Sequence, residues 1–243
     1  MIRELKQAIL FLEDPRALPA LIRWSTFSFT SFRMVRVLER KGVRPRTVLD
    51  VGANIGQFTV AVAGTFSDVT VHAFEPLPSA VARLRRHTAG LRRVTAHEVA
   101  LGDSETVATL RVSANSVSSS LLPMGNTHGE AFPEAAVVEN IEVTVTTLDR
   151  ALAETELTGP VLLKIDAQGY EAHILRGASA TLARADYVLA ETSLVPLYEG
   201  EPTFTELGAC LAERGFVFDA AVGFLESPKT GEILQLDALF RRA

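Results

Sequence analysis

The stretch VLDVGANIGQFT, residues 48–59, determines how the rest of the chain is interpreted. An apolar run typical of a buried strand leads into a glycine-containing turn, and an amphipathic pattern follows. A strand, a glycine turn and a helix in this order indicate a nucleotide site. A dinucleotide fingerprint, G-x-G-x-x-G, that starts at Gly52 would need glycine at positions 54 and 57, but the chain has Asn54 and Gln57. The spacing therefore disfavours a nicotinamide cofactor.

The turn has instead the pattern D-x-G-x-N-x-G, which starts at Asp50. A carboxylate at the end of a strand suits a cationic ligand with an ammonium group, and it would repel a pyrophosphate. Gly52 and Gly56 let the backbone approach a ligand closely, because glycine has no side chain. Asn54 tolerates a left-handed conformation and can cap the helix that follows.

From Thr47 onward, short strand-like runs alternate with helical patterns. The strands that we expect are 47–51, 69–74, 94–99, 160–166 and 186–191, and the helices are 56–65, 79–89, 171–184 and 203–214. This alternation predicts an α/β fold with a doubly wound, mostly parallel sheet and helices on both of its faces. Two further runs, 216–219 and 233–240, predict an antiparallel finish to the sheet.

The chain divides into an N-terminal helical extension, 1–45, and a main domain, 46–243. Within the main domain, residues 105–147 depart from the alternation: two β-like runs, 107–112 and 141–147, flank a long polar segment that we interpret as a binding loop. The extension is interpreted as a layer packed on the sheet edge. A substrate-side cap, a dimer face or a membrane-surface contact are the alternatives.

Composition narrows the function classes. The 243 residues carry a net charge of −5, which argues weakly against nucleic acid as a partner. The single cysteine, Cys210, fits a cytoplasmic protein. No uncharged run approaches the ~18 apolar residues of a membrane span. The five histidines are scattered without metal-ligand spacing, so we predict no zinc site.

Acidic residues and turns at the ends of the next two strands complete the nucleotide site. Glu75 follows Gly56 by about twenty residues, where an acid binds ribose hydroxyls in doubly wound folds; capping of the next helix, which Pro76 helps to start, is the alternative. Gly102 and Asp103 form a turn at the same edge, where Asp103 either bonds an adenine amino group or serves only the turn. The combination predicts S-adenosylmethionine as the cofactor.

Three more motifs make the pattern specific: LKIDAQGYE at 163–171, HILRGA at 173–178, and Glu191 with the downstream YEGEPTF at 198–204. Together with VLDVGANIGQFT, FEP and ALGD, they resemble the FkbM family of S-adenosylmethionine-dependent methyltransferases. The resemblance covers about residues 45–242 and implies a seven-stranded Rossmann-like sheet with an antiparallel last strand. It also implies methylation of a hydroxyl on a sugar, glycolipid or polyketide-type natural product. Family members commonly have an acid where this chain has Gln168.

The predicted cofactor contacts are Asp50, Gly52, Ala53, Asn54, Gly56, Phe58, Glu75, Pro76, Leu101, Gly102, Asp103 and Asp166.

Asp166, at the carboxyl end of its strand, is the first candidate for the general base or the acceptor-orienting residue. Turn formation and helix capping before Glu171 is the structural alternative. Lys164 faces the same side of the strand and, being in an apolar run, should pair with Asp166, Asp50 or Glu191. Glu191 is the second candidate base. A divalent metal between these acids is a less favoured alternative, and we predict none.

Two further histidines and one segment have weaker support as site residues. His173 is interpreted as a structural or surface residue, and His128, in the long loop, as solvated rather than facing an acceptor. The segment 198–204 either lines the acceptor pocket or starts the next helix.

Two other function classes stay open. One is a non-catalytic protein that binds a cofactor or a partner on the same fold, because fold alone does not establish activity. The other is a nicotinamide-dependent oxidoreductase, which Asp50, Asn54 and Gln57 disfavour. The partner that we expect is a small-molecule or glycan hydroxyl acceptor, with a homodimer left open.

Overall fold

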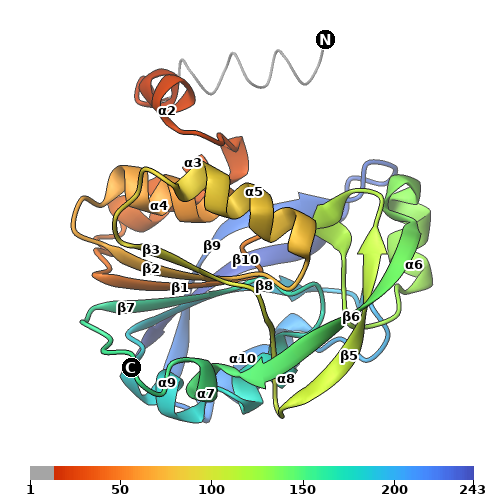
Figure 1. The fold of residues 1–243 in the computed structure, drawn as a ribbon. Coiled ribbons are helices and arrows are strands. Elements are labelled where there is room, and N and C mark those ends of the chain that lie inside the picture. Colours follow the sequence, from red (N-terminus) through yellow and green to blue (C-terminus); the bar gives the residue numbers. More distant parts are fainter. Residues whose placement is uncertain (1–13) are drawn as a thin grey trace.

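The computed structural model describes residues 14–243, which form one α/β domain with a seven-stranded sheet at its centre (Figure 1). The strand order is β3-β2-β1-β7-β8-β10-β9. β1 pairs in parallel with β2 and with β7, whereas β10 pairs antiparallel with both β8 and β9. The predicted doubly wound sheet with an antiparallel last strand is therefore confirmed.

The strands of this sheet are β1 (Thr47–Val51), β2 (Thr70–Phe74), β3 (Val94–His97), β7 (Val161–Ile165), β8 (Tyr187–Ser193), β9 (Phe216–Glu226) and β10 (Ile233–Arg242). Every residue of β1 and β7 is buried, as is expected for central parallel strands that helices cover on both faces.

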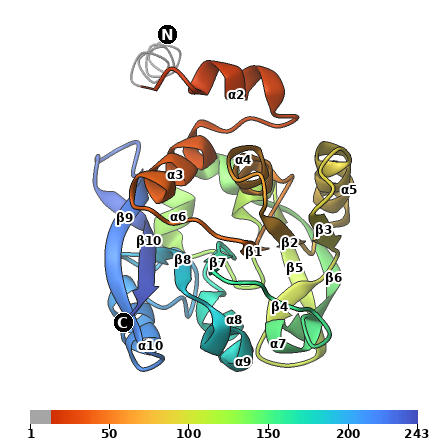
Figure 2. The ribbon, with the colours of Figure 1, turned by 90° about the vertical axis from the view of Figure 1, so that its left-hand side faces the viewer.

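Helices form a layer on each face of the sheet (Figures 1 and 2). The upper layer in Figure 1 holds α3 (Phe29–Arg40), α4 (Gln57–Thr65) and α5 (Pro78–Thr88). The lower layer holds α7 (Leu148–Ala151), α8 (Glu171–Arg176), α9 (Ser179–Arg184) and α10 (Phe204–Ala212).

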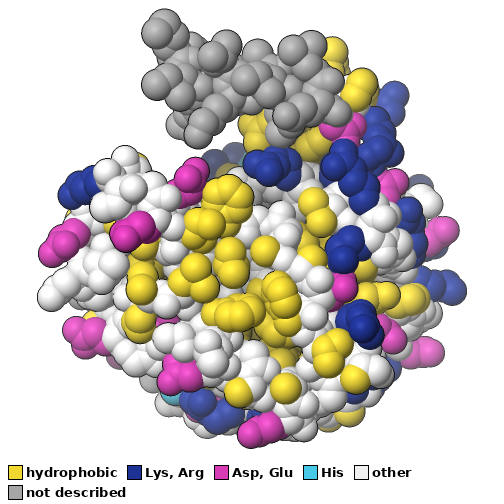
Figure 3. Space-filling model, turned by 180° about the vertical axis from the view of Figure 1, so that it is seen from behind, with side chains coloured by type: hydrophobic (Ala, Val, Ile, Leu, Met, Phe, Trp, Pro, Cys, Tyr) yellow, Lys and Arg dark blue, Asp and Glu magenta, His cyan; other side chains and the backbone are white. Residues whose placement is uncertain are grey.

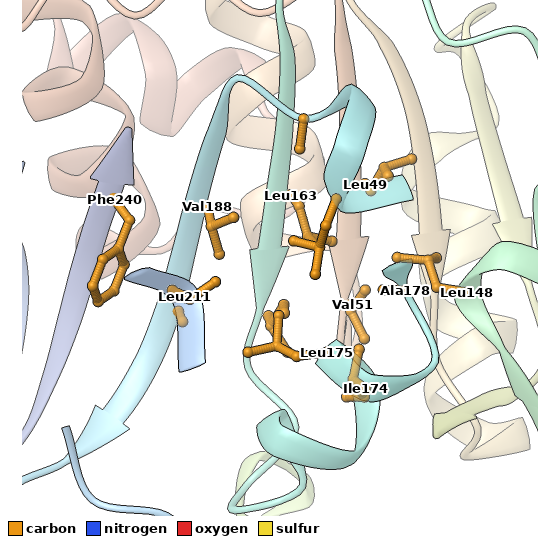
Figure 4. Packing of buried hydrophobic residues seen from close by; sticks show 14 of the residues in the cluster. Leu49, Val51, Leu148, Leu163, Ile174, Leu175, Ala178, Val188, Leu211 and Phe240 are labelled. Atoms are coloured by element: carbon orange, nitrogen blue, oxygen red, sulfur yellow. The ribbon is translucent and has the colours of Figure 1, made fainter. Parts of the chain in front are cut away.

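Each layer has its own hydrophobic core. Below the sheet, Leu163 of β7 packs with Ile174 and Leu175 of α8 and with Leu211 of α10 (Figure 4). Above it, Leu162 packs with α3 and α4, through residues such as Leu38 and Val62. Because neighbouring residues on a strand point to opposite faces, Leu162 and Leu163 together join both cores to one central strand.

Residues 100–147 add a second, smaller sheet with the order β4-β6-β5. Its strands are β4 (Ala100–Gly102), β5 (Thr106–Ser113) and β6 (Val137–Thr147). The predicted β-like runs correspond to β5 and β6. The polar segment between them is not a single loop, because it contains η1 (Ser116–Ser118), α6 (Asn126–Ala131) and η2 (Pro133–Ala135).

The sequence prediction was wrong about the helix at 171–184, which is divided at Gly177 and Ala178. A Cβ on Gly177 would lie 2.0 Å from the backbone oxygen of Gly102, so β4 packs directly against this break. Sequence periodicity continued across the break because Ile174, Leu175, Ala178 and Leu182 all face the same core.

In the N-terminal extension, α2 (Ala17–Arg23) packs on α3 through Ala17, Ala20 and Phe32, and α3 packs on the sheet (Figure 2). Positions 1–13, which the predicted extension includes, lie outside the described residues. No helix in residues 14–243 is long and apolar enough to cross a membrane.

The edge strand β9 exposes Val217, Phe218 and Phe224, and hydrophobic side chains gather on the face seen from behind (Figure 3).

The contact between Gly177 and β4 generates a prediction. Gly177→Ala should lower the free energy of unfolding by about 1–3 kcal/mol, because a methyl group at this position forces the backbone of Gly102 to move. Urea unfolding measures the loss. Gly90→Ala is the matched control, since a Cβ there has nothing within 4 Å and should change stability by less than about 0.5 kcal/mol. Equal effects of the two substitutions would contradict the packing assigned to Gly177.

Candidate active site

A cavity of about 300 Å³ opens at the carboxyl ends of β1, β2 and β7, where doubly wound folds bind ligands. Its wall includes residues 51–54, 57–58, 74–76, 99–101, 164 and 166–168. Of the predicted site residues, the wall brings together Gly52, Ala53, Asn54, Phe58, Glu75, Pro76, Leu101, Lys164 and Asp166. Five others, Asp50, Gly56, Gly102, Asp103 and Glu191, lie outside this wall.

The glycine turn is built by residues in left-handed backbone conformations. Gly52 has a φ of +74°, and a Cβ there would lie 1.8 Å from the backbone oxygen of Asp166. The N–H groups of Gly52 and Ala53 both donate to the Phe74 oxygen, which ties the turn to β2. Asn54, with a φ of +48°, donates its N–H to Glu75 Oε2 at 2.9 Å. The turn therefore holds the carboxylate that follows β2.

Two expectations for the turn were wrong. Asn54 does not cap α4: its Oδ1 accepts the N–H of the adjacent Ile55, and Gly56 occupies the N-cap position. Gly56 faces α5 rather than the cavity, because a Cβ there would lie 2.7 Å from Leu84 Cδ1. Its requirement for glycine comes from its φ of +93°, a backbone conformation that residues with a side chain rarely adopt.

Lys164 forms the electrostatic centre of the site. Its Nζ lies 3.2 Å from Asp50 Oδ1 and 3.3 Å from Asp166 Oδ2, so it contacts two of the three carboxylates predicted for it. Burial alone would lower the pKa of Lys164, but the carboxylates of Asp166 and Asp50 raise it above its usual value. Lys164 is thus a fixed positive charge, and it cannot accept a proton from a substrate.

Asp50 is fully buried behind the cavity wall, which corrects the expectation that it faces a cationic ligand. Its Oδ2 accepts the Thr59 hydroxyl at 2.6 Å, and its Oδ1 faces Lys164. Any effect of Asp50 on a ligand is therefore indirect, through Lys164.

Glu75 lies on the cavity wall and is 8% exposed. Burial raises the pKa of its carboxyl to about 7, although the N–H groups of Leu77 and Asn54 donate to it and lower the pKa. Since Leu77 is the N-cap residue of α5, Glu75 also has the helix-start role that was its alternative interpretation. Each carboxylate oxygen accepts only one of these bonds, so both retain acceptor capacity toward the cavity.

Gly102 and Asp103 do not face the cavity as expected. Asp103 Oδ2 accepts from His173 Nδ1 at 2.9 Å and from Arg176 at 3.1 Å, on α8. Partial burial would raise the pKa of Asp103, but these hydrogen bonds lower it. His173 stacks on Tyr170 at 4.2 Å, so its structural interpretation fits. A Cβ on Gly102 would lie 3.2 Å from the Tyr170 ring, which shows that this glycine makes room for Tyr170.

Asp166 is 33% exposed in its side chain and faces the cavity. Behind it, Glu191 accepts from Gln168 Nε2 at 2.6 Å, and the same nitrogen donates to Asp166 Oδ1 at 3.0 Å. Burial, together with the nearby charges of Asp166 and Asp237, raises the pKa of Glu191 well above its usual value. The sequence marks Gln168 only as a departure from the family pattern.

The cavity wall also contains residues from outside the predicted motifs. α3 and its N-cap contribute Ser28, Ser31 and Met34, and the insertion contributes Ser119 and Ser120. Parts of the extension and of the insertion therefore border the cavity, and the cap and binding-loop interpretations stay predictions. Phe74, Val99, Tyr170 and Ile174 add apolar surface.

Two other candidates from the sequence, His128 and the segment 198–204, contribute to packing and to helix capping. His128 is buried on α6, edge-to-face with Phe132 and Tyr198, rather than solvated. Thr203 caps α10 through a capping box with Glu206, so this part of 198–204 starts a helix. Within residues 14–243, no group of three His, Cys, Asp or Glu residues could hold a metal ion.

The sheet order and the glycine turn at the end of β1 define a Rossmann-like methyltransferase fold. The magnesium protoporphyrin IX methyltransferase ChlM of Synechocystis, solved with bound SAM, superposes with a TM-score of 0.50 at 11% identity. That match covers 88% of this chain and 78% of the other, and it supports the fold.

Sequence comparison places the chain more narrowly. The model of the methyltransferase FkbM domain matches residues 50–218. The chain is 30% identical to the 31-O-demethyl-FK506 methyltransferase FkbM of Streptomyces tacrolimicus, over 73% of this chain and 76% of the relative. It is 27% identical to the 2-O-methyltransferase NoeI of Sinorhizobium fredii, over 63% and 66%. The chain belongs to the FkbM methyltransferase family.

The central position of Lys164 generates a prediction. Lys164→Met should lower the free energy of unfolding by about 3–5 kcal/mol, because it leaves the buried carboxylate of Asp50 without a counter-charge. Chemical denaturation measures the change. Lys41→Met removes a more exposed pair with Asp219 and should cost less than about 1 kcal/mol. If the two variants lost similar stability, Lys164 would not have the central role assigned to it.

Proposed function

We propose that this protein is an O-methyltransferase that uses S-adenosylmethionine to methylate a hydroxyl of a sugar, glycolipid or polyketide-type natural product. The observation that carries the proposal is the carboxylate of Asp166, which lies on the cavity wall with one oxygen toward Lys164 and the other toward Gln168. Two relatives whose names specify O-methylation support the choice of oxygen as the acceptor atom. A cytoplasmic location belongs to the proposal, since the only cysteine, Cys210, is free.

The cavity fits the cofactor chemically. S-adenosylmethionine supplies a methyl group on a positively charged sulfonium. Glu75 would accept hydrogen bonds from the ribose hydroxyls, as acids at this position do in doubly wound folds. Leu101, Tyr170 and Ile174 offer an apolar wall for the base, and the Gly52–Ala53–Asn54 backbone approaches the amino-acid end without a side chain at Gly52.

The protein's own contribution to catalysis is to place the acceptor and to take its proton. An aliphatic hydroxyl is a weak nucleophile until its proton has an acceptor. Asp166 is the exposed carboxylate at the junction of the strand ends, so it orients the hydroxyl and receives the proton. Lys164 fixes that carboxylate at 3.3 Å without competing for the proton, because it is already protonated. Glu191, behind Gln168, acts on the acceptor only indirectly.

Cofactor binding tests the assignment of Glu75. Calorimetry should show micromolar binding of S-adenosylhomocysteine, and Glu75→Ala should weaken it at least about tenfold, because two hydrogen bonds to a charged acceptor are lost. Asp103→Ala should stay within about twofold, since Asp103 bonds α8 instead of facing the cavity.

The pH dependence of binding follows from the same carboxyl. Ribose hydroxyls donate to the ionised form of Glu75, whose pKa is about 7, so affinity should fall as the pH falls through 7. A folded wild-type protein that does not bind would refute the methyltransferase proposal and favour a partner-binding role. An affinity independent of pH would argue against the contact with Glu75.

Turnover tests the role of Asp166. With tritiated S-adenosylmethionine and a panel of sugars and hydroxylated polyketides, Asp166→Ala should lower methyl transfer by about 10²–10⁴-fold, the usual range for a lost general base. Affinity for S-adenosylhomocysteine should stay within a few-fold. Asp68→Ala, at an exposed position, should keep full activity. Turnover that survives in the Asp166 variant would show that the base is another group.

A further inference from the structure

Gln168 makes three side-chain hydrogen bonds beside the cavity. Its Nε2 donates to Asp166 Oδ1 at 3.0 Å and to Glu191 Oε2 at 2.6 Å, while its Oε1 accepts the Tyr198 hydroxyl at 2.7 Å. The backbone is fixed as well: φ is +53°, and the Gln168 oxygen accepts the Ser120 hydroxyl at 2.6 Å. Because both ends of the amide are bonded, the side chain has one defined orientation.

The orientation of the amide follows from the charges around it. A flipped amide would point its carbonyl oxygen at two carboxylates and its N–H groups at the Tyr198 hydroxyl. Tyr198 is 2% exposed, and burial together with the nearby Glu191 raises its pKa, so its hydroxyl keeps the proton and stays a donor. The Nε2 group therefore faces the carboxylates, which can only accept when ionised.

The carboxylates around Gln168 outnumber the cations. Asp166, Asp237 and Glu171 all act on Glu191, and Lys164 is the cation that opposes them. Lys164 lies on the Asp50 side of Asp166, where it contacts Oδ2. The other oxygen of Asp166 and the nearer oxygen of Glu191 meet at Gln168 Nε2. A metal ion could bridge two such oxygens, but here an amide does so.

We propose that Gln168 is a positioning residue that joins the carboxylates of Asp166 and Glu191 through its amide nitrogen. If position 168 carried an acid instead, a divalent cation would be needed between the carboxylates, in the place that the amide nitrogen now occupies. This rests on the proposed function for its consequence in methyl transfer, because Asp166 is the group that meets the acceptor. The link orients Asp166 toward the cavity, and Tyr198 in turn orients the link.

The first test measures the link without any acceptor. Gln168→Met keeps the size of the side chain but removes both donors. Their contribution favours the ionised carboxylates, so it is present at high pH and is lost as the pH falls through the raised pKa of Glu191. The difference in Tm between wild type and variant should therefore grow by about 5 °C as the pH rises through the raised pKa of Glu191, as lost bonds to charged groups predict.

The matched control is Gln57→Met, because Gln57 lines the same cavity from α4, whereas the amide bonds to Asp166 and Glu191 come from Gln168. Its difference in Tm should not change with pH. A pH-independent loss in the Gln168 variant as well would mean that Gln168 only fills space, and would overturn the proposal.

The second test uses Mn²⁺ as a probe. Gln168→Glu places a third carboxylate beside those of Asp166 and Glu191. This variant should bind Mn²⁺ at least about tenfold more tightly than the wild type, as measured by electron paramagnetic resonance titration. Adding Glu191→Gln should reverse the gain, and Gln57→Glu should show none. If Gln168→Glu bound Mn²⁺ no better than Gln57→Glu, the amide would not be in the place of a cation.

Calorimetry with S-adenosylhomocysteine on the same wild-type sample separates the two proposals. If the wild type does not bind the cofactor but the loss of Tm in Gln168→Met depends on pH, the methyltransferase function is refuted and the carboxylate link stands. If the wild type binds the cofactor but the loss of Tm in Gln168→Met does not depend on pH, the methyltransferase function stands and the carboxylate link is refuted.

Discussion

The structure depends on one buried positive charge. Lys164 lies near the carboxyl end of an otherwise apolar strand, β7, and a buried ammonium is stable only when it is paired. It contacts Asp50 on β1 and Asp166 at the end of its own strand, and it donates to the backbone oxygens of Val51 and Gly52. The same ion therefore joins the two central strands, fixes the start of the glycine turn and sets the position of the carboxylate that faces the cavity.

Much of the fold was predictable because it depends on local pattern. The apolar runs at β1 and β7 and the alternation with helices indicate a parallel sheet without any knowledge of distant contacts. The pairing of Lys164 with a carboxylate was also predictable, since a lysine in an apolar strand requires one. The division between α8 and α9 was not predictable, because it depends on the approach of β4 to Gly177, a contact between segments far apart in the sequence.

The errors in the site have a common physical origin. Sequence position places a carboxylate at a strand end, but it does not say which neighbour satisfies it. Thr59 and Lys164 bind Asp50, and His173 and Arg176 bind Asp103, so neither turns to the cavity. Gln168 was missed as a site residue for the converse reason: its importance comes from Tyr198 and Glu191, which only the tertiary structure brings to it.

The cavity wall is assembled from α3, the turn after β1, the insertion and the end of β7. These segments run from residue 28 to residue 174, so only a fragment that includes more than half of the chain contains the complete wall. Ligand binding must therefore be coupled to folding of the whole domain, and a ligand at a hundred times its Kd would add about 2.7 kcal/mol to global stability. In a cell, the supply of cofactor would then regulate how much of this protein survives proteolysis, as well as how fast it works.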